Sequence, residues 1–189
     1  MSLSSYILNN NNWGKSQFIL ADLNSPITRI HFVAHMNTNN EPDHPGGEPT
    51  NHWTLLFTVS DSRSVHIEAA PNEPGRPGMV IIESNKCGLT GEAVHVVSTN
   101  VLSGQTVESL LHVIVNRRRD DYTFDPTGEG CRYWLSTISK DFVEEGIIRK
   151  EESDTVIDAL KMYWPSPSGT PPVLRPMAHG YFGTDNGAR

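Results

Sequence analysis

A change of hydrophobic period near residue 105 is the feature that most constrains how this chain can fold. Before it, apolar and polar residues alternate in short runs, and this period of two predicts strands with one buried face. After it, apolar residues recur at intervals of three and four, which predicts helices with one buried stripe. Because strands and helices occupy separate stretches of the chain, we expect an α+β fold, a small antiparallel β-sheet packed against helices.

The positions of these elements follow from the same patterns. Strands are expected at residues 27–36, 52–59, 64–69, 79–83 and 93–98. A turn at residues 60–63 joins the second and third strands into a hairpin. Helices are expected at residues 105–117 and 131–145, and a third begins with Ser153 as its N-cap and ends before Pro165. The polar segment Asn37–Asn51 is a long loop of the kind that often forms a functional lid.

The domain organisation is expected to be simple, because 189 residues suit one domain of ordinary size. Residues 1–26 are polar and Asn-rich, which is typical of a loose leader. Residues 27–164 then form a single α+β domain, and residues 165–189 form a Pro/Gly-rich tail in which Tyr181 and Phe182 are candidates for docking.

Composition narrows the classes of partner. A net charge of −7 repels a phosphate backbone, so we expect no nucleic-acid partner. No run approaches the ~20 apolar residues of a membrane span, and no secretory signal is visible at the N-terminus. Cys87 and Cys131 are too few for a disulfide framework, which favours free thiols in a reducing, cytoplasmic location. The oligomeric state stays open.

Cys131 occupies the most informative position in the chain. It follows Gly128-Glu129-Gly130 and opens a helix with an apolar stripe. The free N–H groups and the positive dipole end at a helix start favour a thiolate, which is the nucleophilic form of cysteine. The alternative is that Cys131 is a small buried hydrophobe, as free cysteines usually are.

His52 is the candidate base for such a nucleophile, which needs one within hydrogen-bond reach. It opens a predicted strand directly after the long loop, at the edge of the sheet. Its neighbours Asn51 and Trp53 are expected to line the site. The alternative is an ordinary surface histidine.

The order of these residues resembles the lecithin–retinol acyltransferase family, the circularly permuted branch of the NlpC-type, papain-like thiol enzymes. The resemblance covers residues 50–143 and rests on four strings: His52-Trp53, Val65-His66-Ile67-Glu68-Ala69-Ala70-Pro71, Tyr122-Thr123-Phe124 and Gly130-Cys131. It implies a permuted papain-like core, with Cys131 as nucleophile, His52 as general base and His66 as a second histidine. The strings NHW and GEGCRYW also resemble an uncharacterised family of small fungal proteins.

The group that orients His52 is either His66 or Glu68. Matching the apolar faces of the hairpin in the simplest register places Val59 opposite Val65, and the three polar residues then share the other face. In this register His66 and Glu68 lie roughly 20 and 13 Å from His52 along the strand, at ~3.3 Å per residue. A bulge would shorten either distance, so both candidates stay open.

These residues together predict a cysteine-dependent hydrolase or acyltransferase that acts on an ester, thioester or amide of a small molecule. The pocket walls are expected from Arg132, Tyr133 and Trp134, beside Asn51 and Trp53. The chemistry requires no cofactor.

The sequence allows three other interpretations of the function. A metal site at His31 and His35 is disfavoured, because the two are too far apart on a strand and have no third ligand nearby. A non-covalent isomerase or cyclase would use His52 as its acid and base. A non-enzymatic interaction module would use the Pro-rich tail as its ligand.

Overall fold

The computed structural model describes residues 2–37, 49–73, 76–89, 92–102 and 104–183. A six-stranded sheet of order β1-β5-β4-β3-β2-β6 lies at its centre, and only the β1–β5 pair is parallel. The sheet strands are β1 (Trp13–Gly14), β2 (Arg29–Met36), β3 (Asn51–Ser60), β4 (Arg63–Ala70), β5 (Met79–Asn85) and β6 (Ala93–Asn100). The helices are α1 (Leu3–Asn9), the 3-10 helix η1 (Leu20–Asn24), α2 (Val107–Asn116), α3 (Cys131–Glu144) and α4 (Lys150–Leu160).

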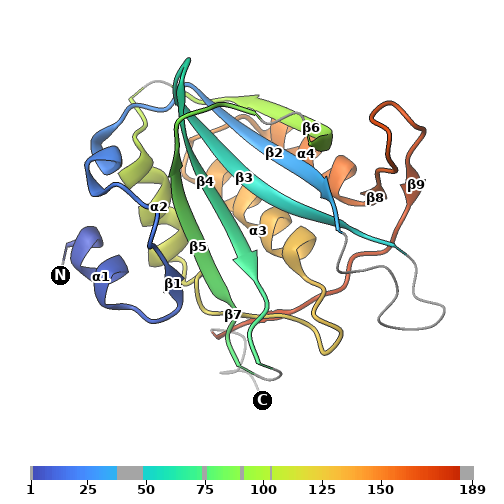
Figure 1. Cartoon of the computed structure of the whole chain (residues 1–189), viewed down its shortest axis with the longest axis horizontal. Helices are drawn as coiled ribbons and strands as arrows, with labels where there is room; N and C mark the ends of the chain where they lie inside the picture. The colour runs from blue at the N-terminus through green and yellow to red at the C-terminus, as the bar shows by residue number, and fades with distance from the viewer. Residues whose placement is uncertain (1, 38–48, 74–75, 90–91, 103, 184–189) are drawn as a thin grey trace.

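Two short pairs complete the structure, β7 (Tyr122–Thr123) with β10 (Tyr181–Phe182) and β8 (Met162–Tyr163) with β9 (Val173–Leu174). The predicted α+β class and the mostly antiparallel sheet are confirmed. Helices α2, α3 and α4 lie behind the sheet in Figure 1, so one face of the sheet is covered.

The core lies between this covered face and the helices. Trp53, Leu55 and Phe57 alternate along β3 and are fully buried against the helix layer. Helix α3 packs on β3 and β4 and contributes a stripe that includes Trp134 and Ile138. Each such side chain stabilises the fold by about 1.5–3 kcal/mol relative to exposure, so this interface holds the start of α3 firmly against the sheet.

The β3–β4 hairpin has a different register from the simplest one. A bulge between Thr58 and Ser60 places Val65 opposite Phe57, so the pairing of Val65 with Val59 is wrong by two residues. A shift of two leaves every side chain on its own face, because the side-chain period of a strand is also two. It moves both His66 and Glu68 two residues closer to His52.

Strands β3 and β4 separate at the other end of the hairpin. Among the described residues, the last pair of this ladder is Leu55 with Ile67, although β3 begins at Asn51 and β4 continues to Ala70. Each strand keeps its outer partner there, β3 pairing with β2 and β4 with β5. Figure 1 shows the two strands diverging, with α3 behind the opening. The split exposes the start of α3 between the two strand ends.

The first 26 residues differ from the expected loose leader. Helix α1 buries Leu3 and Ile7, and Trp13 of β1 is buried while its strand extends the main sheet. The indole Nε1–H of Trp13 donates to Asp120 Oδ2 at 2.9 Å. A few large apolar residues in this polar segment are enough to dock the segment on the core, because each of them is buried separately.

The C-terminal segment also differs from the expected tail up to residue 183. Strand β10 pairs with β7, and Phe182 is buried. Gly183 N–H donates to the carbonyl of Asp121 at 2.8 Å, which anchors the end of the described chain. The Pro and Gly residues of this segment predict few helices or strands in it. Its docking depends instead on contacts with residues 121–123, which are distant in the sequence.

Helix α4 begins at Lys150, so the prediction of Ser153 as its N-cap is wrong. Glu152 accepts from the backbone N–H of Arg149 at 3.2 Å, which satisfies the helix start instead. Ser153 is buried inside the helix and its hydroxyl lies 2.8 Å from that of Ser139 on α3.

Residues 38–48 of the expected lid segment Asn37–Asn51 lie outside the described residues, so its role as a lid stays a prediction. Within the described parts of the chain, no helix has the length and apolar character needed to cross a membrane.

Candidate active site

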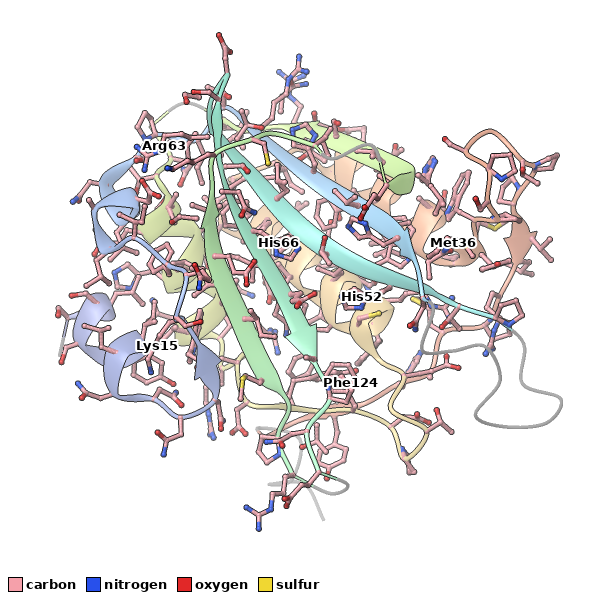
Figure 2. The ribbon with its side chains drawn as sticks, in the orientation of Figure 1. Lys15, Met36, His52, Arg63, His66 and Phe124 are labelled. Carbon is pink, nitrogen blue, oxygen red and sulfur yellow. The ribbon has the colours of Figure 1, made fainter. Side chains whose placement is uncertain are left out.

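Three side chains from separate elements meet at the split between β3 and β4. His52 comes from β3, Glu68 from β4 and Cys131 from the start of α3. They line one cavity of about 430 Å³, together with residues of the loop that leads into α3. Figure 2 shows His52 beside this opening, close to α3. The cavity exists because the two strands separate where the helix begins.

Glu68 holds the imidazole of His52. The distance from His52 Nε2 to Glu68 Oε2 is 2.6 Å, and the carboxylate accepts this hydrogen bond. The hydrogen bond to His52 lowers the pKa of Glu68 despite the opposing effect of burial, so the carboxylate stays ionised. With Nε2 directed at Glu68, the other ring nitrogen is left for Cys131.

Cys131 lies close enough to His52 to affect the pKa of the imidazole, as Glu68 does. Burial on its own lowers the pKa of His52, but the hydrogen bonds to Cys131 and Glu68 outweigh it and raise the pKa to about 10. His52 therefore carries its proton at neutral pH. Cys131 Sγ also lies 3.9 Å from the carbonyl oxygen of Asn51, a longer and weaker contact.

The backbone at the start of α3 presents hydrogen-bond donors next to the sulfur. The first i→i−4 bond of the helix runs from Trp134 N–H to the carbonyl of Gly130 at 3.0 Å. The N–H groups of Cys131, Arg132 and Tyr133 consequently have no acceptor within the helix. Together with the helix dipole, they favour negative charge at this end.

Gly130 must be glycine for this geometry. Its φ of 149° lies in the region that side chains other than glycine rarely adopt. A Cβ on it would lie 2.6 Å from Tyr122 Oη. The close approach of Tyr122 therefore depends on the missing side chain.

His66, the second histidine of the resemblance, does not contact His52. Its Nδ1 lies 4.0 Å from Glu83 Oε2, and it lines a separate cavity of about 190 Å³. Burial lowers the pKa of His66, whereas at His52 the hydrogen bonds outweigh the same effect and the pKa is raised. Of the two candidates for orienting His52, the structure brings only Glu68 into contact.

The aromatic residues expected to form the pocket walls lie elsewhere. Trp53 and Trp134 are fully buried in the core, and the Nε1–H of Trp134 donates to the carbonyl of Arg119 at 2.7 Å. Tyr133 stacks on His179 with ring centroids 4.3 Å apart. These three expectations are wrong, because Trp53 and Trp134 belong to the buried faces of β3 and α3, and the Tyr133 ring packs on the C-terminal segment.

Arg132 lines the cavity, but its guanidinium group is hydrogen-bonded to backbone carbonyls of the protein. It is buried and donates to the backbone carbonyls of Leu160, Arg175 and Pro176 at 3.3, 2.8 and 2.7 Å. These bonds anchor the C-terminal segment, and because Arg132 also lines the cavity, its role in substrate binding stays a prediction.

Asn51 lines the cavity as expected, but its amide is also engaged. It donates to the carbonyl of Trp164 at 2.8 Å and accepts from the N–H of Trp164 at 2.7 Å.

Several residues around the site were not predicted. Met36, Pro71 and Phe124 line the cavity, and Arg175 forms an ion pair with Glu129 at 2.9 Å. Phe124 and Pro71 end two of the strings that carry the family resemblance, which is the local signal for these two. Arg175 and Met36 reach the site through tertiary packing and have no motif of their own.

No group of three or more His, Cys, Asp or Glu residues suited to a metal ion occurs among the described residues. His31 is engaged by hydroxyls, 2.7 Å from Ser98 Oγ and 2.9 Å from Thr58 Oγ1.

Comparison with known proteins identifies one family. The family model described as "Domain of unknown function (DUF7770)" matches residues 30–183, which include the whole candidate site. No curated protein and no solved structure shows significant similarity to the chain.

Proposed function

The chain belongs to the DUF7770 family, and from the geometry of its site we propose that it is a cysteine-dependent hydrolase or acyltransferase acting on an ester, thioester or amide of a small molecule. The observation that carries the proposal is the meeting of Cys131, His52 and Glu68 in one cavity, although the three are far apart in the sequence. A nucleophile, a proton carrier and a group that orients the carrier are the parts that covalent acyl transfer requires.

The fold supports the same reading. A cysteine at the start of a helix packed on an antiparallel sheet, with the histidine on a strand that precedes it in the chain, matches the order expected of a permuted papain-like core. We include this core in the proposal.

In the first step, Cys131 attacks the substrate carbonyl as a thiolate paired with protonated His52. A sulfur–carbon bond forms, and the carbonyl oxygen becomes an oxyanion that the Cys131 N–H stabilises. His52 donates its proton to the departing oxygen, nitrogen or sulfur as the bond to the leaving group breaks. Glu68 keeps the imidazolium in place through its 2.6 Å hydrogen bond.

In the second step, water or an acceptor alcohol or amine enters the cavity. His52, now neutral, removes a proton from it as it attacks the acyl carbon. The sulfur–carbon bond breaks, and Cys131 returns to the thiolate form with His52 protonated.

The cavity suits a small neutral substrate. Both carboxylates that line it are paired, Glu68 with His52 at 2.6 Å and Glu129 with Arg175 at 2.9 Å. A volume of about 430 Å³ is within the range of small-molecule sites. The net charge of −7 further disfavours an anionic polymer.

The test is to compare the two thiols of the protein. At pH 7, iodoacetamide should alkylate the half-buried Cys131 faster than the exposed Cys87, and peptide mass spectrometry measures both rates in one sample. Cys131→Ala should abolish turnover, whereas Cys87→Ala should leave it intact. Equal reactivity of the two thiols would refute the nucleophile. Turnover that survives Cys131→Ala but not His52→Ala would indicate non-covalent chemistry instead.

A further inference from the structure

The hydroxyl of Tyr122 joins two backbone segments beside the nucleophile. Its Oη donates to the carbonyl of Gly130 and accepts from the N–H of Gly180, both at 3.0 Å. Tyr122 is 2% exposed, so both hydrogen bonds are shielded from water. Burial raises the pKa of Tyr122 well above its ordinary value, so the hydroxyl remains a donor at any pH at which the protein is assayed.

The carbonyl that Tyr122 binds is part of the peptide unit that contains the Cys131 N–H. A peptide unit is planar and trans, so the direction of its C=O determines the direction of its N–H. The Gly130 oxygen accepts from Trp134 N–H on the helix side and from Tyr122 Oη on the β7 side. Two donors from different elements therefore hold the plane of this peptide.

The Tyr122 hydroxyl fits between Gly130 and Gly180 because neither residue has a side chain. A Cβ on Gly130 would lie 2.6 Å from Tyr122 Oη, and a Cβ on Gly180 would lie 2.5 Å from it. Gly130 has a φ of 149°, in a range of backbone conformations that other residues avoid. The two hydrogen bonds to its carbonyl restrict the rotation that a glycine otherwise allows.

We propose that Tyr122 is a positioning residue that fixes the Gly130–Cys131 peptide so that the Cys131 N–H is directed at the oxyanion of the acyl-transfer step. The inference rests on the proposed function, because it assigns a role within that reaction. Tyr122 acts through the backbone and does not touch the substrate carbonyl. The Gly180 contact extends the same constraint to the C-terminal segment.

Two reactions of the same sulfur separate this role from general integrity of the site. With 4-nitrophenyl acetate, Cys131 attacks the acetyl carbon, an oxyanion develops, and 4-nitrophenolate leaves to give acetyl-Cys131. With iodoacetamide, the sulfur displaces iodide from a methylene carbon and no oxyanion forms. The ratio of the acylation rate to the alkylation rate therefore reports on stabilisation of the oxyanion.

Tyr122→Phe should lower the acylation rate about 10-fold and change the alkylation rate by less than about 2-fold, since losing a whole oxyanion donor costs about 100- to 1,000-fold. The matched control is Tyr6→Phe, which removes a part-buried hydroxyl bound to Asp120 Oδ2 at 2.8 Å, outside the cavity. It should leave the ratio unchanged. Placing 4-aminophenylalanine at position 122, which restores a donor, should recover most of the acylation rate.

The outcomes separate the two proposals. If Tyr122→Phe leaves the ratio of acylation to alkylation unchanged, including the case in which both rates fall equally, the positioning role is overturned while Cys131 stays the nucleophile. Wild-type protein in which Cys131 reacts no faster than Cys87 with both reagents overturns the proposed function, and the positioning role with it. Thermal unfolding of each variant establishes that the rates are measured on folded protein.

Discussion

The titration of His52 offers a quantitative test of the site. The pKa of His52 is about 10, against an ordinary value of 6.5, because its hydrogen bonds to Cys131 and Glu68 outweigh burial. Glu68→Gln removes the charge of one partner and keeps its size. A hydrogen bond to a charged group is worth about 1.5–3 kcal/mol, and 1.36 kcal/mol corresponds to one pKa unit. The imidazole side chain is 32% exposed, so solvent screening favours the lower end of this range.

We therefore expect Glu68→Gln to lower the pKa of His52 by about one, and Cys131→Ala to lower it as well, because each change removes a hydrogen-bond partner of the imidazole. NMR detection of the His52 ring proton and carbon shifts across pH 5–11 measures these midpoints. Glu83→Gln is the matched control, since Glu83 lies near His66 and not His52. A wild-type midpoint near 6.5, or equal midpoints in wild type and Glu68→Gln, would refute the reasoning.

Four further predictions concern stability, which thermal or denaturant unfolding measures. Gly130→Ala should destabilise the fold by about 1–3 kcal/mol, because alanine is strained at a φ of 149°, and it should slow alkylation of Cys131. A Gly130→Ala protein as stable and as reactive as the wild type would contradict the close packing of Tyr122 on Gly130. Ile7→Ala should cost about 2–4 kcal/mol, whereas Leu8→Ala, at a 47% exposed position, should cost little; equal small effects would mean that α1 does not belong to the core. The His52 contribution to stability should be complete below pH 6.5 and lost as the pH rises through about 10, because the folded-state pKa is the higher one. The Glu68 contribution should be present above pH 4.5 and lost as the pH falls further, because its folded-state pKa is the lower one; a pH profile unaffected by Glu68→Gln would exclude this linkage.

The predicted elements were most accurate where the pattern was periodic. Alternation located the sheet strands from Arg29 onward within a few residues, and the three-to-four spacing located α2 and α3. The prediction failed where single apolar residues act alone, as with Leu3, Ile7 and Trp13 in the segment expected to be a loose leader. One buried side chain has no period, so local pattern does not reveal it.

The candidate site divides in the same way. Cys131 and His52 stood out because a residue type with specific chemistry occupied the end of an element, which is visible locally. Trp53 and Trp134 do not line the site although they lie near His52 and Cys131 in the sequence, because their own periodicity places them in the core. Arg132 lines the cavity as expected, but its carbonyl partners could not be predicted, because they lie in segments 28 or more residues away.

The amino-acid pattern alone predicts the fold class and places Cys131 and His52 at the ends of their elements. It leaves two candidates, His66 and Glu68, for the group that orients the histidine. The tertiary structure decided that choice through the bulge between Thr58 and Ser60, which moves Glu68 toward His52. Registers that differ by two residues keep the same faces buried, so the hydrophobic pattern cannot distinguish them. The split between β3 and β4 likewise depends on which outer strand each one pairs with. That pairing forms across the sheet, and it is what brings Cys131, His52 and Glu68 into one cavity.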